Sequence, residues 1–273
     1  MNLAATARLN NGVEIPRVGL GVYQSPRGAV TQNAVREALR LGYRHIDTAQ
    51  IYGNESDVGT AVRASGIPRA DVFVTTKLWN DNQGYDAALR AFDATQKRIG
   101  LDYVDLYLLH WPVARKRLDS WRALERLVEE GRVRAIGVSN FMVHHLEELL
   151  AHAKVPPAMN QIELSPFLQQ REVSAFCDKH GIVVEAYSPL TRGERLADPV
   201  VVRVAERVQR TPAQVLLRWG LQHGFVVLPK STHVERIREN MALFDFEIPA
   251  AEMAKLDGLE EGLVTGWDPR QAP

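Results

Sequence analysis

Cysteine is almost absent from this chain of 273 residues, because Cys177 is the only one and no internal disulfide can form. A lone thiol in an apolar stretch is typical of an inert buried residue and favours a reducing compartment. Long apolar runs are also missing, both at the start of the chain and within it. We therefore expect no signal peptide, no membrane span and a cytoplasmic location.

The chain has no excess of either charge. Lys plus Arg number 33 and Asp plus Glu number 33, so the formal net charge is zero. Proteins that bind polyanions usually carry a basic surplus, and the composition therefore argues against a nucleic-acid partner. His144, His145 and His152 stand near one another, but no second cluster has metal-ligand spacing, so no metal site is expected. The G-x-S-x-G signature of many hydrolases is absent as well.

What the sequence does contain is a repeated alternation of short β-rich runs and amphipathic helices. The predicted strands are 17–21, 44–48, 72–77, 104–110, 135–139, 158–163, 183–188 and 225–229. Helical stretches between them include 30–41, 85–99, 120–130, 144–153 and 170–180. Nearly continuous apolar runs are typical of parallel strands that are buried on both faces. Eight such units without a break in composition predict one α/β domain over residues 1–273, a (β/α)8 barrel.

An Asn-Gly turn precedes the first of these units. Asn11-Gly12 lies between the apolar runs 7–9 and 13–15, which predicts a β-hairpin ahead of the main fold. The alternative to a barrel is an open doubly wound sheet. No G-x-G-x-x-G follows the first strand, so a Rossmann-type dinucleotide site lacks its main support and the barrel is favoured.

Polar side chains stand at the carboxyl end of most predicted strands, where barrel enzymes place their active sites. They are Asp47 with Tyr52 in the next loop, Lys77, His110, Ser139, Asn140, Asn160, Gln161, Glu163, Tyr187, Ser188, Lys230 and Ser231. Each alone has a structural explanation, such as a helix cap, a rim ion pair or a satisfied core histidine. Their recurrence at one end of one barrel predicts a functional site instead.

Four of these residues suit the reduction of a carbonyl group. Tyr52 would supply a proton, and a nearby Lys77 cation would lower its pKa from the usual ~10. Asp47 would keep Lys77 charged, and a neutral His110 would hold the carbonyl oxygen against the Tyr52 hydroxyl. None of these side chains can supply hydride, so the chemistry requires a cofactor.

The residues after the last strands indicate which cofactor. Lys230, Ser231, Thr232 and Arg236 follow strand eight, where barrels commonly bind phosphate. Arg236 can form a two-point contact with a phosphate dianion, which suits the 2′-phosphate of NADP. An ordinary solvated helix start, with Glu235 and Glu239 pairing these bases, is the alternative. Other residues could hold the nicotinamide, Tyr187 by stacking and Ser139, Asn140 and Gln161 by bonding the carboxamide.

Together these motifs resemble the aldo-keto reductases over residues 19–257, nearly the whole chain. The stretches that carry the resemblance are 42–49 with 52–55, 74–79, 102–112, 136–141, 160–163, 186–190, 228–231, 236–237 and 239–240. They include Tyr43-Arg44-His45-Ile46-Asp47-Thr48-Ala49, Leu109-His110-Trp111-Pro112 and Leu228-Pro229-Lys230-Ser231. The motifs occur in the family's order.

The resemblance implies a barrel whose bottom is closed by the hairpin. It implies a catalytic tetrad of Asp47, Tyr52, Lys77 and His110, with Tyr52 as the general acid, and NADPH as the cofactor. Its implied cofactor contacts are Ser139, Asn140 and Gln161 at the carboxamide, Tyr187 on the nicotinamide, Ser188 and Leu190 at the pyrophosphate, Lys230, Ser231, Thr232 and Arg236 at the 2′-phosphate, and Glu239 and Asn240 at the adenine. The chain resembles compact bacterial 2,5-diketo-D-gluconate reductases and general aldehyde or dicarbonyl reductases, which makes 2,5-diketo-D-gluconate and methylglyoxal-like compounds candidate substrates.

Two segments are short compared with many relatives. The loop 191–193 leaves little to cover a cofactor, and Arg192 is expected to contact the pyrophosphate instead. The tail 262–273 is brief, so we expect a shallow pocket for a small carbonyl substrate, walled by Tyr23, Trp79, Trp111 and Trp267. Core packing is the alternative for these aromatic residues.

Two other functions stay open from the sequence. One is a non-catalytic NADPH-sensing barrel, which the complete tetrad disfavours. The other is a Schiff-base aldolase using Lys77 or Lys230 as the nucleophile. Since no apolar interface segment is evident, a monomer is expected.

Overall fold

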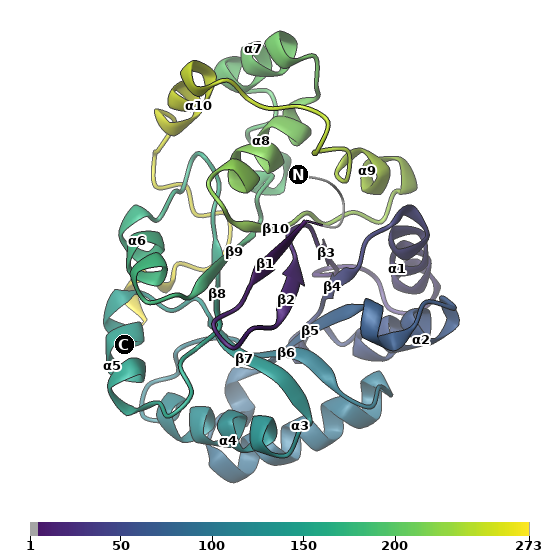
Figure 1. Cartoon of the computed structure of the whole chain (residues 1–273), viewed down its shortest axis with the longest axis vertical. Helices are drawn as coiled ribbons and strands as arrows, with labels where there is room; N and C mark the ends of the chain where they lie inside the picture. The colour runs from purple at the N-terminus through teal and green to yellow at the C-terminus, as the bar shows by residue number, and fades with distance from the viewer. Residues whose placement is uncertain (1–4, 273) are drawn as a thin grey trace.

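The computed structural model describes residues 5–272, and strands and helices alternate along this part of the chain (Figure 1). Two strands form an N-terminal hairpin and eight form one parallel sheet. The hairpin strands are β1 (Thr6–Arg8) and β2 (Glu14–Pro16). The sheet strands are β3 (Leu20–Gly21), β4 (His45–Asp47), β5 (Phe73–Leu78), β6 (Val104–Leu109), β7 (Val133–Ser139), β8 (Met159–Glu163), β9 (Val183–Tyr187) and β10 (Val226–Leu228).

Helices follow the sheet strands and surround them. They are α1 (Ala29–Leu41), α2 (Glu55–Ala64), α3 (Tyr85–Ile99), α4 (Arg117–Glu129), α5 (Val143–His152), α6 (Arg171–Lys179), α7 (Pro199–Val208), α8 (Pro212–Gln222), α9 (Val234–Glu239) and α10 (Ala250–Asp257). Two of them, α7 and α10, lie outside the simple alternation of strand and helix and pack beside each other at one edge of the barrel (Figure 1). Within residues 5–272, no helix is both long enough and apolar enough to cross a membrane.

The sheet closes on itself, as the sequence predicts for a barrel. Its strands pair in sequence order from β3 to β10, and bridges at Val18–Val227 and Gly21–Lys230 join the first strand to the last. The amide of Val227 donates to the Arg17 carbonyl at 2.9 Å across this seam. A closed parallel barrel leaves no free sheet edge, and the open doubly wound alternative is therefore excluded.

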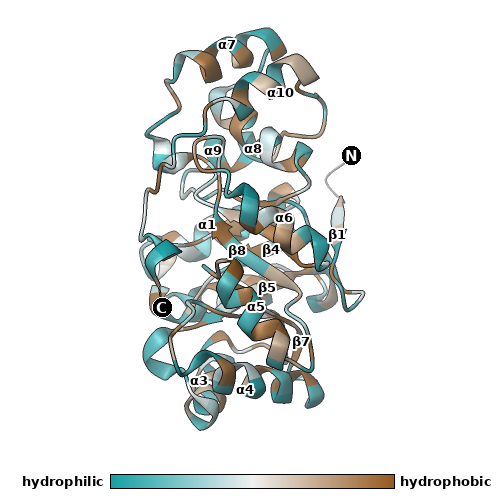
Figure 2. Ribbon diagram, turned by 90° about the vertical axis from the view of Figure 1, so that its left-hand side faces the viewer, coloured by the Kyte–Doolittle hydropathy of each residue, from teal (hydrophilic) through white to brown (hydrophobic). Residues whose placement is uncertain are grey.

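The N-terminal hairpin closes the end of the barrel where the strands begin, which confirms the prediction. Its buried side chains Leu9 and Ile15 pack in one cluster with residues from several sheet strands. Those partners are Phe73, Leu106, Leu108, Ala135, Met159 and Val226. Figure 1 shows the hairpin lying across the barrel, and Figure 2 shows it on the opposite side of the molecule from the C-terminus. The end where the strands finish is thus left for a site.

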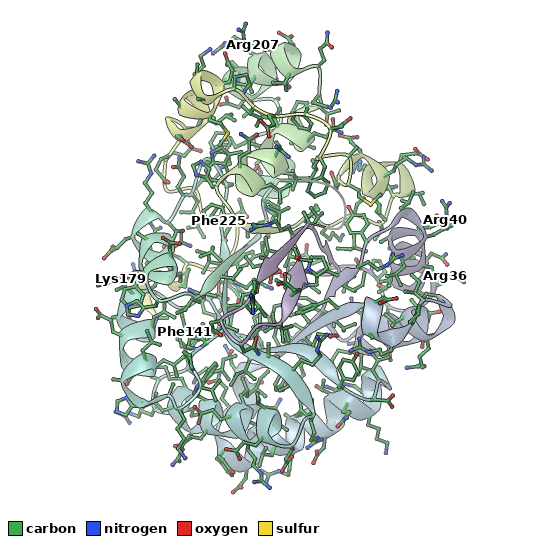
Figure 3. The ribbon with its side chains drawn as sticks, in the orientation of Figure 1. Arg36, Arg40, Phe141, Lys179, Arg207 and Phe225 are labelled. Atoms are coloured by element: carbon green, nitrogen blue, oxygen red, sulfur yellow. The ribbon has the colours of Figure 1, made fainter. Side chains whose placement is uncertain are left out.

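The outer helices follow their amphipathic pattern. In α1 the buried residues are Thr31, Ala34, Val35, Ala38 and Leu39, the spacing of one helix face. Charged residues of the outer layer such as Arg36, Arg40 and Arg207 point away from the barrel, whereas Phe141 points inward (Figure 3). Burial of these apolar faces against the sheet supplies the main driving force for folding.

Most of the predicted boundaries agree with the structure to within two residues, and the two larger differences have local causes. The first strand, predicted over residues 17–21, has ladder pairing only at Leu20–Gly21, because its earlier residues pair with the hairpin end and with β10. Helix α4 begins at Arg117 rather than at Ser120, since its first turn follows directly after the loop from His110.

Helices α2 and α3 approach too closely for any side chain at Gly59. A Cβ built on Gly59 would lie 1.7 Å from the carbonyl oxygen of Ile99, the last residue of α3. We expect Gly59→Ala to lower the free energy of unfolding by about 2 kcal/mol, because overpacking exceeds the gain of about 1 kcal/mol in helix propensity. Urea unfolding followed by circular dichroism measures this change.

Gly258→Ala is the control, because Gly258 has a φ of −78° and its Cβ would make a tight contact, 3.3 Å from the Lys255 carbonyl oxygen, instead of a clash. It should change the free energy of unfolding by less than about 1 kcal/mol. Equal stability of the Gly59→Ala variant and the parent would contradict the close packing of α2 on α3.

Candidate active site

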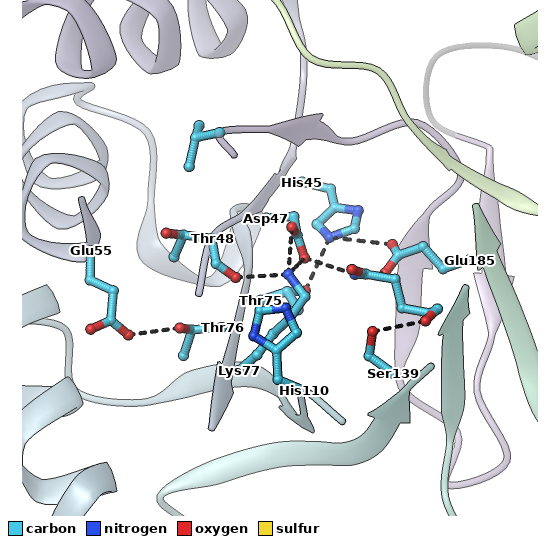
Figure 4. Close-up of polar contacts among 12 residues, drawn as sticks. His45, Asp47, Thr48, Glu55, Thr75, Thr76, Lys77, His110, Ser139 and Glu185 are labelled. Atoms are coloured by element: carbon cyan, nitrogen blue, oxygen red, sulfur yellow. Dashed lines mark hydrogen bonds and ion pairs between the residues drawn. The ribbon is translucent and has the colours of Figure 1, made fainter. Parts of the chain in front are cut away.

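An ion pair between β4 and β5 lies at the end of the barrel opposite the hairpin. Lys77 Nζ donates to both carboxylate oxygens of Asp47 at 2.7 Å and to the backbone carbonyl of Thr48 at 2.9 Å (Figure 4). Lys77 is completely buried and Asp47 nearly so. Neighbouring parallel strands place both side chains toward the barrel axis, which is why residues 30 positions apart meet.

The Tyr52 ring lies beside this pair on η1 (Gln50–Tyr52), with its centroid 5.1 Å from Lys77 Nζ. The pKa of Tyr52 is not lowered overall, contrary to the expectation from the nearby Lys77 cation. Burial raises the pKa of Tyr52 well above its usual value, and the negative charge of Asp47 raises it further. Because Asp47 holds the lysine with both oxygens, the pair offers the phenol little net positive charge. Tyr52 therefore keeps its proton at neutral pH.

His110 completes the predicted tetrad from the end of β6. Its ring lies edge-on to Tyr52 with the centroids 5.9 Å apart, and edge-on to Trp79 at 5.3 Å. Burial and the Lys77 charge hold the pKa of His110 well below its usual value, so the ring is neutral. Its Nδ1 is buried and has no hydrogen-bond partner among residues 5–272. The structure thus brings all four predicted catalytic side chains together, with one neutral donor and one protonated phenol at the same place.

A second polar layer lies beneath the tetrad, and sequence reasoning assigned only Gln161 among its members. Gln161 Nε2 donates to Asp47 at 2.9 Å and to Glu185 at 2.6 Å. His45 Nε2 lies 3.1 Å from the Thr75 hydroxyl and 3.8 Å from Glu185 (Figure 4). Burial, with help from Lys77, lowers the pKa of His45 to about 3, so this imidazole is neutral too.

A signal for this layer was present in the sequence. His45 precedes Asp47 by two positions, Thr75 precedes Lys77 by two, and Glu185 precedes Tyr187 by two. Side chains two apart in a strand face the same way, so polar residues at the strand ends have polar neighbours one step deeper in the barrel.

The residues predicted to hold the nicotinamide also gather at the site. The Tyr187 hydroxyl donates to Asn140 Oδ1 at 2.8 Å, and Asn140 Nδ2 donates to the His110 carbonyl at 2.9 Å. The Ser139 hydroxyl donates to the backbone carbonyl of Gln161 at 2.8 Å. Strands β7, β8 and β9 are neighbours in the sheet, so their ends present these groups side by side.

The predicted phosphate-binding residues follow β10 on the adjacent side. Lys230 and Arg236 are exposed, and neither forms an ion pair within residues 5–272. Glu235 pairs with Arg238 instead, and Glu239 accepts from the Thr211 hydroxyl. Ser231 and Asn240 are buried and Thr232 is half-buried. The alternative in which Glu235 and Glu239 neutralise Lys230 and Arg236 is therefore not what the structure has.

The short loop after β9 has strained backbone. Ser188, Thr191 and Arg192 have φ angles of 48°, 49° and 52°, which non-glycine residues rarely adopt. The Arg192 guanidinium lies 5.9 Å from the centre of the Tyr23 ring, and Leu190 is half-buried against the core. The contacts of Arg192 are thus with the predicted pocket wall, and its contact with a pyrophosphate stays a prediction.

The predicted aromatic wall is a real cluster at the mouth of the site. The ring centroids of Trp267 lie 6.3 Å from Trp79 and 6.0 Å from Trp111, and Tyr23 lies 5.0 Å from Tyr52. Trp267 is 65% exposed and Tyr23 is 41% exposed. Core packing, the alternative for these residues, therefore does not apply to Tyr23 and Trp267.

The tail that carries Trp267 is tied to the barrel on both sides of this residue. The buried carboxylate of Glu163, at the end of β8, accepts from the backbone amide of Thr265 at 2.9 Å and from its hydroxyl. The ring of His145 bonds the carbonyl of Ala272 at 3.0 Å. Glu163 was noted in the sequence only as a strand-end polar residue, and its partner 102 positions later could not be predicted from spacing.

Removal of Lys77 should expose the cost of burying Asp47. Lys77→Met leaves a buried carboxylate without its cation, and we expect the free energy of unfolding at pH 7 to fall by about 3 kcal/mol. Asp47→Asn combined with Lys77→Met should lose clearly less, because no unpaired charge remains. Urea unfolding of both variants tests this, and a double variant as unstable as Lys77→Met would contradict it.

Comparisons with known proteins agree with this geometry. Residues 17–261 match the model of the aldo/keto reductase family. The chain is 48% identical over 268 residues to a glyoxal reductase of Bacillus subtilis, covering 98% of this chain and 97% of the relative. It is 50% identical over 264 residues to a 9,11-endoperoxide prostaglandin H2 reductase of Trypanosoma cruzi, covering 96% and 93%. A crystal structure of an aldo/keto reductase from Brucella melitensis superposes with a TM-score of 0.91 at 48% identity, covering 94% of this chain and 99% of the other. The chain therefore belongs to the aldo/keto reductase family.

Proposed function

We propose that this protein reduces aldehydes, ketones or dicarbonyl compounds to alcohols with NADPH, and that Tyr52 is the general acid. The observation that carries the proposal is the meeting of a protonated phenol and a neutral imidazole over the buried Lys77–Asp47 pair. The similarity to a glyoxal reductase supports small dicarbonyls as substrates. Compounds resembling methylglyoxal and 2,5-diketo-D-gluconate are the candidates of this class.

The chain's own groups fit a nicotinamide dinucleotide phosphate. Gln161 Oε1 accepts no hydrogen bond within residues 5–272, which leaves an acceptor for a carboxamide. Lys230 and Arg236 are cations without carboxylate partners in the described chain, which suits a phosphate. Further contacts would come from Ser139, Asn140, Tyr187, Ser188, Leu190, Arg192, Ser231, Thr232, Glu239 and Asn240. When bound, the reduced cofactor supplies the hydride that protein side chains cannot.

The tetrad residues have separate roles in this proposal. The neutral His110 and the Tyr52 hydroxyl donate hydrogen bonds to the substrate oxygen, where negative charge develops. Tyr52 then gives its proton to that oxygen. Asp47 holds Lys77 in place.

The two alternatives have less support. An aldolase would need Lys77 or Lys230 as a free amine. Lys77 Nζ donates to three oxygen atoms and has no open side for attack on a carbonyl, and Lys230 follows β10 among the predicted phosphate-binding residues. A barrel that only senses NADPH would not need a protonated phenol beside a neutral histidine. Neither alternative accounts for the aromatic wall as well as a small-carbonyl pocket does.

Tyr52→Phe tests the assigned acid. The variant should lose at least about 100-fold in kcat for methylglyoxal and phenylglyoxal, because the proton donor is removed. Its affinity for NADPH should change less than about threefold, since the ring is kept. Tyr23→Phe is the matched control on the neighbouring ring and should keep most of its activity. A Tyr52→Phe variant as active as the parent would refute the mechanism.

Arg236→Ala tests the phosphate contact. Loss of a charge-assisted hydrogen bond should weaken NADPH binding about 10- to 100-fold and NADH binding by less than about threefold. Titration of the protein's tryptophan fluorescence with each cofactor gives both values. Arg238→Ala, on the same helix but paired with Glu235, should change neither. Equal losses for NADPH and NADH in Arg236→Ala would rule out a 2′-phosphate contact.

A further inference from the structure

Glu185 is a buried carboxyl group to which the proposed reaction gives no task. It stands on β9 two residues before Tyr187 and is completely inaccessible to solvent. Its Oε2 accepts from Gln161 Nε2 at 2.6 Å, and its Oε1 lies 3.8 Å from His45 Nε2 (Figure 4). A carboxyl group is costly to bury, so a specific interaction is expected to explain it.

The Gln161 side chain is held between two carboxyl groups. Its Nε2 donates to Glu185 on one side and to Asp47, at 2.9 Å, on the other. A side-chain amide nitrogen carries two protons, so both are used. The amide oxygen of Gln161 must then point away from these carboxyl groups, and it accepts no hydrogen bond within residues 5–272. A reversed amide would set its oxygen against two acceptor groups.

We propose that Glu185 is a positioning residue that orients the Gln161 amide, so that Gln161 Oε1 is presented to the NH2 group of the nicotinamide carboxamide. The inference rests on the proposed function, because it takes the nicotinamide to bind at Gln161. Glu185 itself does not touch the cofactor. Glu185 disfavours the reversed orientation of the Gln161 amide. In that orientation the Gln161 NH2 group would face the NH2 group of the carboxamide, and no hydrogen bond could form between these two donors.

Charge balance explains how Glu185 can stay buried there. The polar groups that face it are His45 and Asp47 from β4, Lys77 from β5, Gln161 from β8 and Tyr52 from η1. Lys77 is the one cation among these groups, and Asp47 already neutralises it. Burial and the Asp47 charge raise the pKa of Glu185 to about 8, so the group is a neutral acid at pH 7. Because Oε2 accepts from Gln161, the proton belongs on Oε1, and Oε2 still faces the Gln161 amide as an acceptor.

This protonation gives a test that does not depend on the cofactor. Between its ordinary pKa of 4.5 and about 8, Glu185 keeps a proton in the folded protein that it loses in the unfolded chain. The contribution of Glu185 to stability is therefore present at low pH and is lost as the pH rises to about 8. In Glu185→Gln, which mimics the neutral acid, the unfolding midpoint in urea should fall less between pH 5 and 8 than in the parent. An equal fall of the urea midpoint in the parent and in Glu185→Gln would refute the neutral form of Glu185.

The orientation itself is tested by binding two oxidised cofactors, NADP+ and its 3-acetylpyridine analogue, in which a methyl group replaces the carboxamide NH2. Fluorescence titration of the parent, Glu185→Gln, Glu185→Met and Glu185→Val gives each affinity. The two apolar variants should bind NADP+ about tenfold more weakly than the parent, the value of one hydrogen bond, and should bind the analogue as the parent does. Glu185→Gln should bind both within about threefold of the parent, because it keeps an acceptor.

Each other outcome has a definite meaning. Equal weakening of NADP+ and the analogue in the apolar variants would show general damage to the site and overturn the proposal. Unchanged NADP+ affinity in those variants would overturn it as well, as would a Glu185→Gln variant as weak as Glu185→Met. Failure of the unsubstituted protein to bind NADP+ would instead refute the proposed function on which the inference rests.

Discussion

The buried ion pair of Lys77 and Asp47 sets the conditions under which the neighbouring side chains gain or lose protons. Its one positive and one negative charge are buried side by side and largely cancel, so the neighbouring groups experience little net charge. Desolvation then decides their state, and Tyr52 and Glu185 keep protons while His45 and His110 lose them. This end of the barrel interior is therefore polar in composition but almost neutral in charge.

This balance accounts for the one clear error in the sequence-based chemistry. Sequence identifies Lys77 as a neighbour of Tyr52 and so predicts a lowered pKa for the phenol. It cannot show that both carboxylate oxygens of Asp47 accept from Lys77, or that the Tyr52 ring is partly buried against the core. The sign of a pKa shift depends on these distances and on burial, and neither follows from residue type or spacing.

The fold and the tetrad were predictable for a common reason. Parallel strands all end on the same side of a barrel, so Asp47, Lys77 and His110 could be placed together from strand order alone. The roles of His45 and Glu185 in the second layer were not assigned, because a single polar residue within an apolar strand does not indicate which residue it contacts. Contacts of the C-terminal tail, such as that of Glu163 with Thr265, join residues far apart in the sequence. No repeat in the sequence relates these positions, so the contacts could not be inferred from it.

The two ties on the tail make it a bridge across the mouth of the barrel. Thr265 and Ala272 are both fixed to the barrel, and the chain between them carries Trp267. A segment fixed at both ends costs little additional entropy when its length changes, about 0.6 kcal/mol for each doubling. The span between the two ties can therefore be exchanged for one of different length or shape while the strands beneath it remain as they are. Trp267 and the tetrad are in this sense separate modules, since the span that carries Trp267 can change without a change in the strands that carry the tetrad.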